Sequence, residues 1–69
     1  MAETRDLISD VEARILQLLA DGKRPKDIAC SLHLTVNVVN IHLVRIREKY
    51  EAATTYNAVA TAIRQGVID

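Results

Sequence analysis

The side chains with the most distinctive chemistry in this 69-residue chain lie on one predicted helix, within residues 35–50. At about 3.6 residues per turn, the two sides of this helix differ, although both carry apolar residues. The side that suits a protein core carries Val39, Leu43, Ile46 and Tyr50. The opposite side carries amides, aliphatic groups and charges, at Asn37, Asn40, Ile41, Val44, Arg45 and Glu48. Amides hydrogen-bond base edges and aliphatic groups contact thymine methyls, so this second side suits the floor of a DNA major groove.

Four residues of this second side also have an alternative interpretation. Asn40 carries the paired donor and acceptor that fit adenine N6 and N7, and Asn37 can do the same or contact a phosphate. Both can also be solvated amides. Ile41 and Val44 fit thymine methyls, but exposed apolar residues are common on proteins and can form a protein-binding patch. The helix therefore predicts either a DNA-reading surface or a protein-binding surface.

Charge is balanced over the whole chain but not along it. Nine basic and nine acidic residues give a net charge of zero, which is unlike a general polyanion binder. Between positions 23 and 49, however, only Asp27 and Glu48 are acidic. Thr35 and the backbone N–H groups at the start of the second predicted helix are further expected DNA contacts. The basic residues of this segment are predicted phosphate contacts or, taken singly, solvated charges: Lys23, Arg24, Lys26, Arg45, Arg47 and Lys49.

Length and composition indicate one small all-α domain. Two Gly and one Pro are too few for the many turns of an all-β chain. No apolar run approaches the ~18 residues of a membrane span, and Met1 leads into a polar segment unlike a signal peptide, so no membrane contact is expected. Cys30 is the single cysteine, which excludes an internal disulfide and fits a reducing cytoplasm. Residues 1–7 are expected to form a flexible arm and residues 8–69 the domain.

The first helix has recognisable ends. Ser9 and Glu12 have the spacing of a capping box at its start, and Gly22 is placed to end it. Gly66 is placed to end the last helix in the same way. The predicted buried stripe of the first helix is Val11, Ile15, Leu18 and Leu19.

Three further helices are predicted from their caps. Pro25 opens the second helix, because a missing N–H costs nothing at that position. A tight turn at 33–35 follows, and Thr35 caps the third helix. The fourth helix begins after Thr54 or Thr55. The second helix, the turn and the third helix form a predicted helix-turn-helix within a four-helix, bundle-like domain.

The chain resembles the LuxR-type (GerE-like) DNA-binding domain over about residues 8–68. The resemblance runs in order and without a gap through all four predicted helices. Outside the helix-turn-helix it rests on residues 8–16, 18–22, 57–62 and 66–68. Within the helix-turn-helix it rests on residues 26–29 and on Leu32, Leu34, Thr35, Val39, His42, Ile46 and Lys49.

Several residues depart from the family pattern. Asn40 stands where the family usually has a lysine that meets DNA, and Val38 stands where it usually has threonine. Arg24 replaces the usual serine cap of the second helix. Glu51 replaces the usual glycine after the third helix, and Thr55 replaces an arginine of the last helix. The resemblance therefore implies an intact scaffold with an altered reading face.

The resemblance implies a DNA-binding transcriptional regulator of the bacterial cytoplasm, or the carboxy-terminal domain of one. The third helix would enter the major groove of double-stranded DNA, and the transcription machinery is a further expected partner. The fourth helix would pair two copies into a homodimer. The predicted pairing surface is Ala58, Val59, Ala62 and Ile63. The competing prediction is a helix-turn-helix-derived module that binds and modulates a partner regulator without reading DNA.

Catalysis and cofactor binding are not predicted. The sequence offers no nucleophile–base pair, phosphate-cradling glycine loop or paired-carboxylate cleft, so an enzyme is not expected. Cys30, His33 and His42 are scattered without a close pair, so neither a metal nor another cofactor is expected. His42 is predicted to be a partly buried structural imidazole, and Glu12 a cap or an internal salt-bridge partner.

Overall fold

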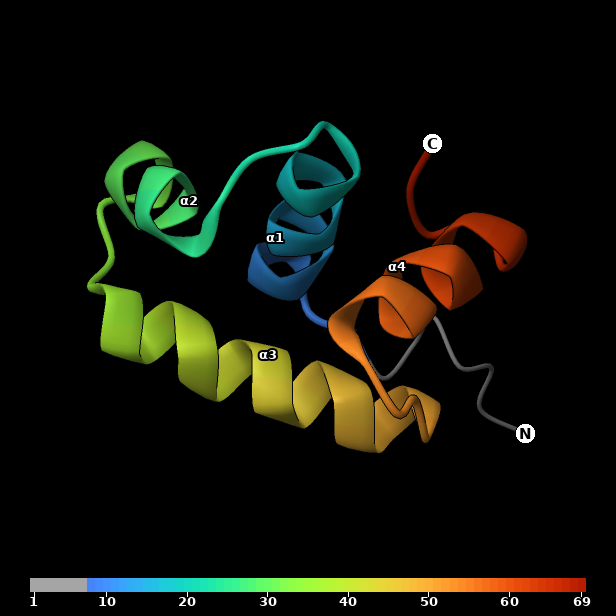
Figure 1. Ribbon diagram of the computed structural model, residues 1–69. Helices are drawn as coiled ribbons and strands as arrows, with labels where there is room; N and C mark the ends of the chain where they lie inside the picture. Colours follow the sequence, from blue (N-terminus) through green and yellow to red (C-terminus); the bar gives the residue numbers. More distant parts are fainter. Residues whose placement is uncertain (1–7) are drawn as a thin grey trace.

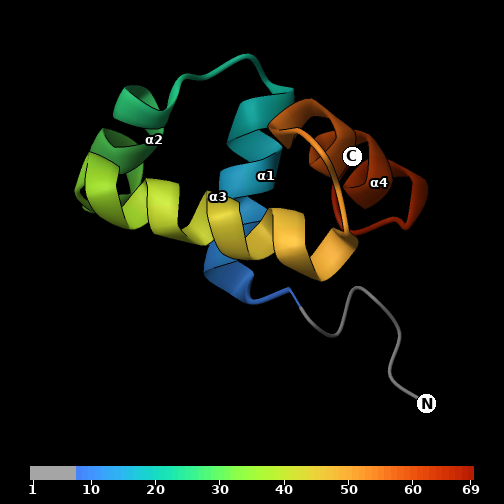
Figure 2. The same cartoon turned by 60° about the horizontal axis from the view of Figure 1, so that its bottom comes forward.

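The computed structural model describes residues 8–69, which form an all-α domain (Figure 1). Its helices are α1 (Asp10–Ala20), α2 (Pro25–Leu32), α3 (Val36–Tyr50) and α4 (Thr55–Arg64). The predicted fold class and the four predicted helices are confirmed, while the predicted arm, residues 1–7, lies outside the described residues. In Figure 1, α3 runs along one side of the molecule, and α1, α2 and α4 all lie on its other side. Figure 2 brings α3 forward, where it crosses in front of α1.

The α2–α3 corner has the geometry of a helix-turn-helix. The two helices are bent by 109° relative to one another, within the range of about 90–120° that this motif shows. Leu34, in the turn, is half-buried and packs against the core, which anchors the corner. Within residues 8–69 no single helix is long and apolar enough to cross a bilayer, and α2 and α3 reach that length only together, across this bend.

Side-chain caps start three of the helices where the sequence predicts them. Ser9 and Glu12 form the predicted capping box, with Glu12 N donating to Ser9 Oγ at 3.1 Å and Ser9 N donating to Glu12 Oε1 at 3.3 Å. Thr35 Oγ1 accepts from the N–H of Val38 at 3.1 Å. Thr54, rather than Thr55, caps α4. These caps satisfy N–H groups that a helix leaves unpaired in its first turn.

The α2 helix starts without a side chain that accepts a hydrogen bond from the N–H groups of its first turn. Arg24 occupies the cap position, and its guanidinium has no acceptor atom to offer to the backbone. Asp27 compensates in part, because its Oδ2 accepts the N–H of Arg24 at 3.3 Å. Pro25 is the first helical residue, as predicted.

All four helices end in the same motif. Each motif places one residue in the left-handed region, and these residues are Gly22 (φ 89°), His33 (φ 57°), Glu51 (φ 52°) and Gly66 (φ 73°). The next N–H then donates to the carbonyl five residues earlier, from Lys23, Leu34, Ala52 and Val67 at 2.8 to 3.0 Å. The two predicted glycine stops are confirmed, and the other two helices use a non-glycine residue in a conformation that favours glycine.

We expect Glu51→Gly to raise the free energy of unfolding by about 0.5–1 kcal/mol, because it relieves a left-handed backbone at a helix end. Urea unfolding followed by circular dichroism measures this. Gly22→Ala is the reverse control and should lower stability, since its left-handed φ is strained with any Cβ although a Cβ there would meet no atom within 4 Å. A Glu51→Gly variant no more stable than the parent would contradict the expected strain.

The core confirms three residues of the predicted stripe of α1, because Ile15 is buried and Leu18 and Leu19 pack against the core, and it corrects the fourth. The largest fully buried side chains are Ile15, Leu16, Ile28, Val39 and Ile46. Val11, predicted to be buried, is 42% exposed, so that prediction is wrong. The inward positions of α1 instead begin at Glu12, which is 2% exposed. Since Glu12 finds partners on α3, the helix turns its Glu12 side inward and leaves Val11 outside.

The α4 helix corrects the predicted pairing surface. Ala58 and Ala62 are 1% and 0% exposed in the protein's own core, so their predicted place on a surface between two copies is wrong. Their small side chains let α4 pack closely on α1 and α3. The larger apolar groups that α4 leaves accessible are Tyr56 (86% exposed), Ile63 (46% exposed) and the half-buried Val59.

Candidate nucleic-acid interface

One whole side of α3 is uncovered by the rest of the domain. We call this side the α3 outer face and define it by six exposed residues: Asn37, Asn40, Ile41, Val44, Arg45 and Glu48. Ile41 is 52% exposed and Val44 is 46% exposed. The predicted division of α3 into two sides is confirmed, because the opposite side buries Val39, Leu43 and Ile46. The outer face is therefore a protruding, convex helix surface bearing amides and aliphatic groups.

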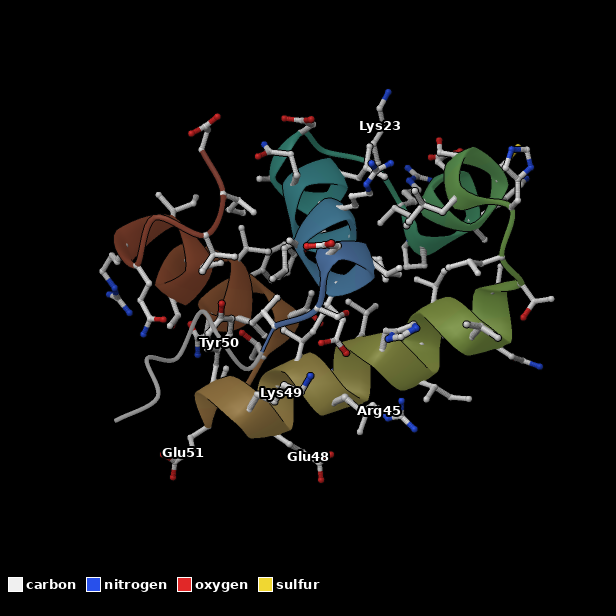
Figure 3. The ribbon with its side chains drawn as sticks, turned by 180° about the vertical axis from the view of Figure 1, so that it is seen from behind. Lys23, Arg45, Glu48, Lys49, Tyr50 and Glu51 are labelled. Atoms are coloured by element: carbon white, nitrogen blue, oxygen red, sulfur yellow. The ribbon has the colours of Figure 1, made fainter. Side chains whose placement is uncertain are left out.

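Charged groups occupy the C-terminal end of this face. In Figure 3, Arg45, Glu48 and Glu51 project from the same side of α3, away from the other helices. Arg45 is the only cation of the α3 outer face. The six residues of the face carry one cation and one anion, so the face lacks a continuous basic rim.

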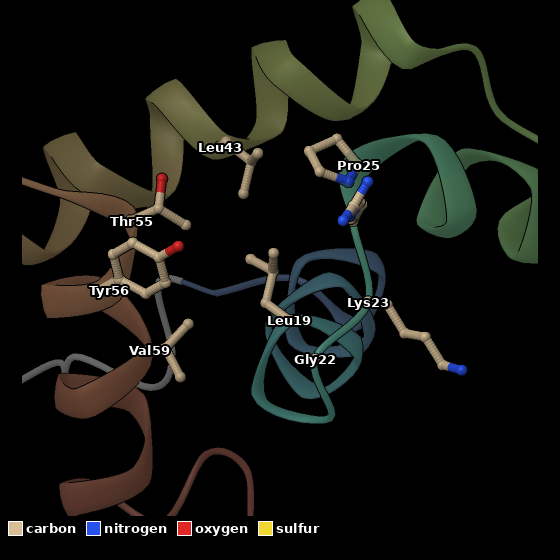
Figure 4. A pocket seen from close by; sticks show the side chains of 9 residues that line it. Leu19, Gly22, Lys23, Pro25, Leu43, Thr55, Tyr56 and Val59 are labelled. Carbon is tan, nitrogen blue, oxygen red and sulfur yellow. The ribbon is translucent and has the colours of Figure 1, made fainter.

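The structure does not bring all six predicted phosphate contacts together. Arg24, Lys26 and Arg45 are exposed. Lys23 is also exposed, but it lies at the opposite end of the molecule from the α3 outer face and points away from it (Figures 3 and 4). Lys23 is thus badly placed to share a ligand with α3.

Two further cations on α3 are already engaged at its flanks. Lys49 Nζ lies 2.5 Å from Glu12 Oε1 on α1. Arg47 Nη1 donates to Thr55 Oγ1 on α4 at 3.0 Å. Both side chains hold α3 against its neighbours, so the predicted phosphate contacts at Arg47 and Lys49 compete with packing contacts inside the domain. Sequence spacing cannot reveal the Lys49 pair, whose members are 37 positions apart.

Glu12 is the centre of the contact that positions α3. Besides Lys49 and the N–H of Ser9, His42 contacts it, with Nδ1 3.2 Å from Oε2. Burial raises the pKa of the Glu12 carboxyl, but the hydrogen bonds from Lys49, His42 and Ser9 together outweigh burial and leave this pKa below its ordinary value. The predicted structural roles of Glu12 and His42 are confirmed. The cluster ties α1 to α3 and fixes the orientation of the outer face.

A shallow pocket of about 500 Å³ lies elsewhere, between α1, α4 and the start of α2 (Figure 4). Leu43 contributes to it from the inner side of α3, so the pocket and the α3 outer face lie on different sides of that helix. Its other apolar lining includes Leu19, Pro25 and Val59. Within residues 8–69, no group of three metal-ligating side chains is close enough to hold a metal ion.

A 109° corner between two helices, with the second one uncovered along its outer side, defines a helix-turn-helix domain. The chain belongs to the family described as bacterial regulatory proteins, luxR family (GerE), whose profile matches residues 6–62. This family membership confirms the resemblance seen in the sequence and places the chain among regulatory proteins rather than enzymes.

Relatives include several regulators. The chain is 38% identical over 60 residues, 87% of its own length, to the uncharacterized response regulatory protein YgeK of Escherichia coli K12. It is 31% identical over 67 residues, 97% of its length, to the response regulator protein VraR of Staphylococcus aureus. It is 29% identical over 66 residues, 96% of its length, to the transcriptional activator protein AhyR of Aeromonas hydrophila. It spans 41%, 32% and 25% of these three relatives, respectively.

Proposed function

We propose that this domain binds double-stranded DNA with α3 in the major groove and regulates transcription in the bacterial cytoplasm. The observation that carries the proposal is the α3 outer face, an uncovered helix side held by the α2–α3 corner. A major groove about 12 Å wide admits one α-helix, and α3 presents amides and aliphatic groups along an open side. The activator name of one relative supports a role in transcription.

The proposed contacts divide by chemistry. Asn37, Asn40, Ile41 and Val44 meet base edges, because they occupy the N-terminal half of α3. Arg45, Lys26 and Arg24 meet phosphates, together with free N–H groups in the first turn of α2. Thr35 serves mainly as the α3 cap, since its hydroxyl already accepts the N–H of Val38.

We expect Arg45→Ala and Lys26→Ala each to weaken binding to all duplexes about equally. Each should also reduce the slope of log affinity against log salt by about 0.9, the value for one lost phosphate contact. Fluorescence anisotropy with random-sequence duplexes over a salt series measures both effects. Lys23→Ala is the matched control and should change neither, because Lys23 points away from α3. Binding that hardly responds to salt would contradict the DNA proposal.

Pairing of two copies through α4 is part of the proposal, since two α3 helices can then meet successive major grooves. Ile63→Arg should leave the domain folded, because Ile63 is 46% exposed, and should abolish cooperative binding to a two-fold symmetric site. Asn57→Arg, on another exposed side of α4, is the control. Sedimentation on DNA gives the number of copies bound. Cooperative binding that survives Ile63→Arg would place the pairing surface elsewhere.

A protein partner is the second candidate for the α3 outer face. The observation in its favour is the acidic end of α3, where Glu48 and Glu51 project on the same side as Arg45 (Figure 3). These carboxylates oppose phosphates but suit a basic partner surface. The salt series distinguishes the two candidates, because only the DNA proposal expects affinity for duplexes with no partner present.

A further inference from the structure

In the N-terminal half of α3, positions 36–44, the side chains on the outer face that could contact bases are all uncharged. Between positions 36 and 44 there is no Lys, Arg, Asp or Glu. The one titratable residue in this stretch, His42, faces Glu12 on α1 and not the outer face. The groups available to base edges are therefore the amides of Asn37 and Asn40 and the aliphatic side chains of Ile41 and Val44.

This chemistry discriminates between base pairs. Guanine is read chiefly by bidentate Arg or Lys, and cytosine by the carboxylates of Asp or Glu. Neither kind of group is present between positions 36 and 44. Adenine is read by the bidentate amide of Asn or Gln, and thymine by apolar contact with its methyl group. Thr35 Oγ1 accepts the N–H of Val38 at 3.1 Å but keeps an O–H that can serve any base, so Thr35 adds no preference between base pairs.

The four groups also have the spacing of consecutive base pairs. Asn37 and Val44 are separated by about 10 Å along the helix axis, at ~1.5 Å per residue. This length corresponds to about three base pairs at ~3.4 Å each. Asn37, Asn40, Ile41 and Val44 lie within one stripe, because they stand at positions i, i+3, i+4 and i+7 of the helix. Arg45 and Glu48 lie beyond this stretch, toward the C-terminal end.

We propose that the N-terminal half of α3 selects a run of about three A·T base pairs, with Asn37 and Asn40 on adenines and Ile41 and Val44 on thymine methyls. This inference rests on the proposed DNA binding. G·C pairs are accepted only outside the run, where Arg45 can reach a base or a phosphate.

The test begins with selection of duplexes from a randomised pool by the full 69-residue chain. Enriched sites with A·T pairs at three adjacent positions support the inference, and enriched sites centred on G·C pairs overturn it while leaving DNA binding intact. A pool from which no duplex is retained at low salt overturns the proposed function itself.

Replacing thymine by deoxyuridine in an enriched site removes only the methyl groups. We expect each contacted methyl to contribute about threefold to fivefold in affinity. Ile41→Ala and Val44→Ala should reduce this difference, whereas Val11→Ala, an exposed valine on α1, should preserve it. Equal affinity of the parent chain for thymine and uracil sites would overturn the methyl contacts.

Discussion

Replacing Glu12 by alanine is expected to lower the free energy of unfolding by about 2–4 kcal/mol. The carboxylate is 2% exposed and joins Ser9, His42 and Lys49, so its removal breaks the α1 capping box and the α1–α3 contact together. A domain of this size has only about 5–10 kcal/mol of stability in total. Denaturant unfolding by circular dichroism should therefore show a large fall in midpoint.

Two variants separate the buried charge from the side chain. Glu12→Gln keeps the volume and an acceptor for the N–H of Ser9, so it should cost less than alanine does. Glu48→Gln changes an exposed carboxylate and should alter stability by less than about 0.5 kcal/mol. If Glu12→Ala cost no more than Glu48→Gln, the cluster would not hold α1 on α3.

The same carboxylate makes stability depend on pH. Burial disfavours its charge, but hydrogen bonds from Lys49, His42 and Ser9 leave the pKa of Glu12 below the ordinary 4.5. Its contribution is therefore complete above the ordinary value and is lost as pH falls through the lowered pKa of the folded state. Glu12→Gln should remove this part of the acid dependence, as urea midpoints at several pH values would show.

Placing a carboxylate on the α3 outer face is expected to reduce DNA affinity by about 100-fold or more, for example in Ile41→Glu. Ile41 is 52% exposed, so the fold should tolerate the change. In the groove, however, the new charge would face the phosphates on both strands and lose its hydration. Anisotropy titrations at low salt measure the loss.

The control for this substitution carries the same charge at another exposed apolar position. Val11→Glu, on α1, changes net charge equally at a residue that is 42% exposed, and it should weaken binding far less. Equal losses in the two variants would indicate a general charge effect and would remove the case for α3 as the reading helix.

The helix boundaries could be predicted because their determinants are local. Each helix start depends on residues within one turn of it, so the sequence contains the whole signal. These residues are Ser9 with Glu12 for α1, Pro25 for α2 and Thr35 for α3. The exposed side of α3 could also be predicted from the sequence, because the apolar periodicity identifies the opposite side as the side that faces the core.

The predictions that the structure contradicts concern contacts between residues that are distant in the sequence. The prediction that Val11 is buried failed because its neighbour Glu12 turns inward, toward Lys49, 37 positions away. The role of Ala58 depends on how closely α4 approaches α1 and α3, which small residues allow but do not dictate. The placement of Lys23 required the path of the chain between α1 and α2, since its charge alone is indistinguishable from that of Lys26.

The most direct test of DNA binding through α3 is an NMR titration of the isotopically labelled chain with short random-sequence duplexes at low salt. The expected result is a set of amide shift changes concentrated in residues 36–45 and in the first turn of α2. Changes confined to the exposed side of α4 or to the pocket between α1 and α4, or no changes at all, would contradict the proposed interface.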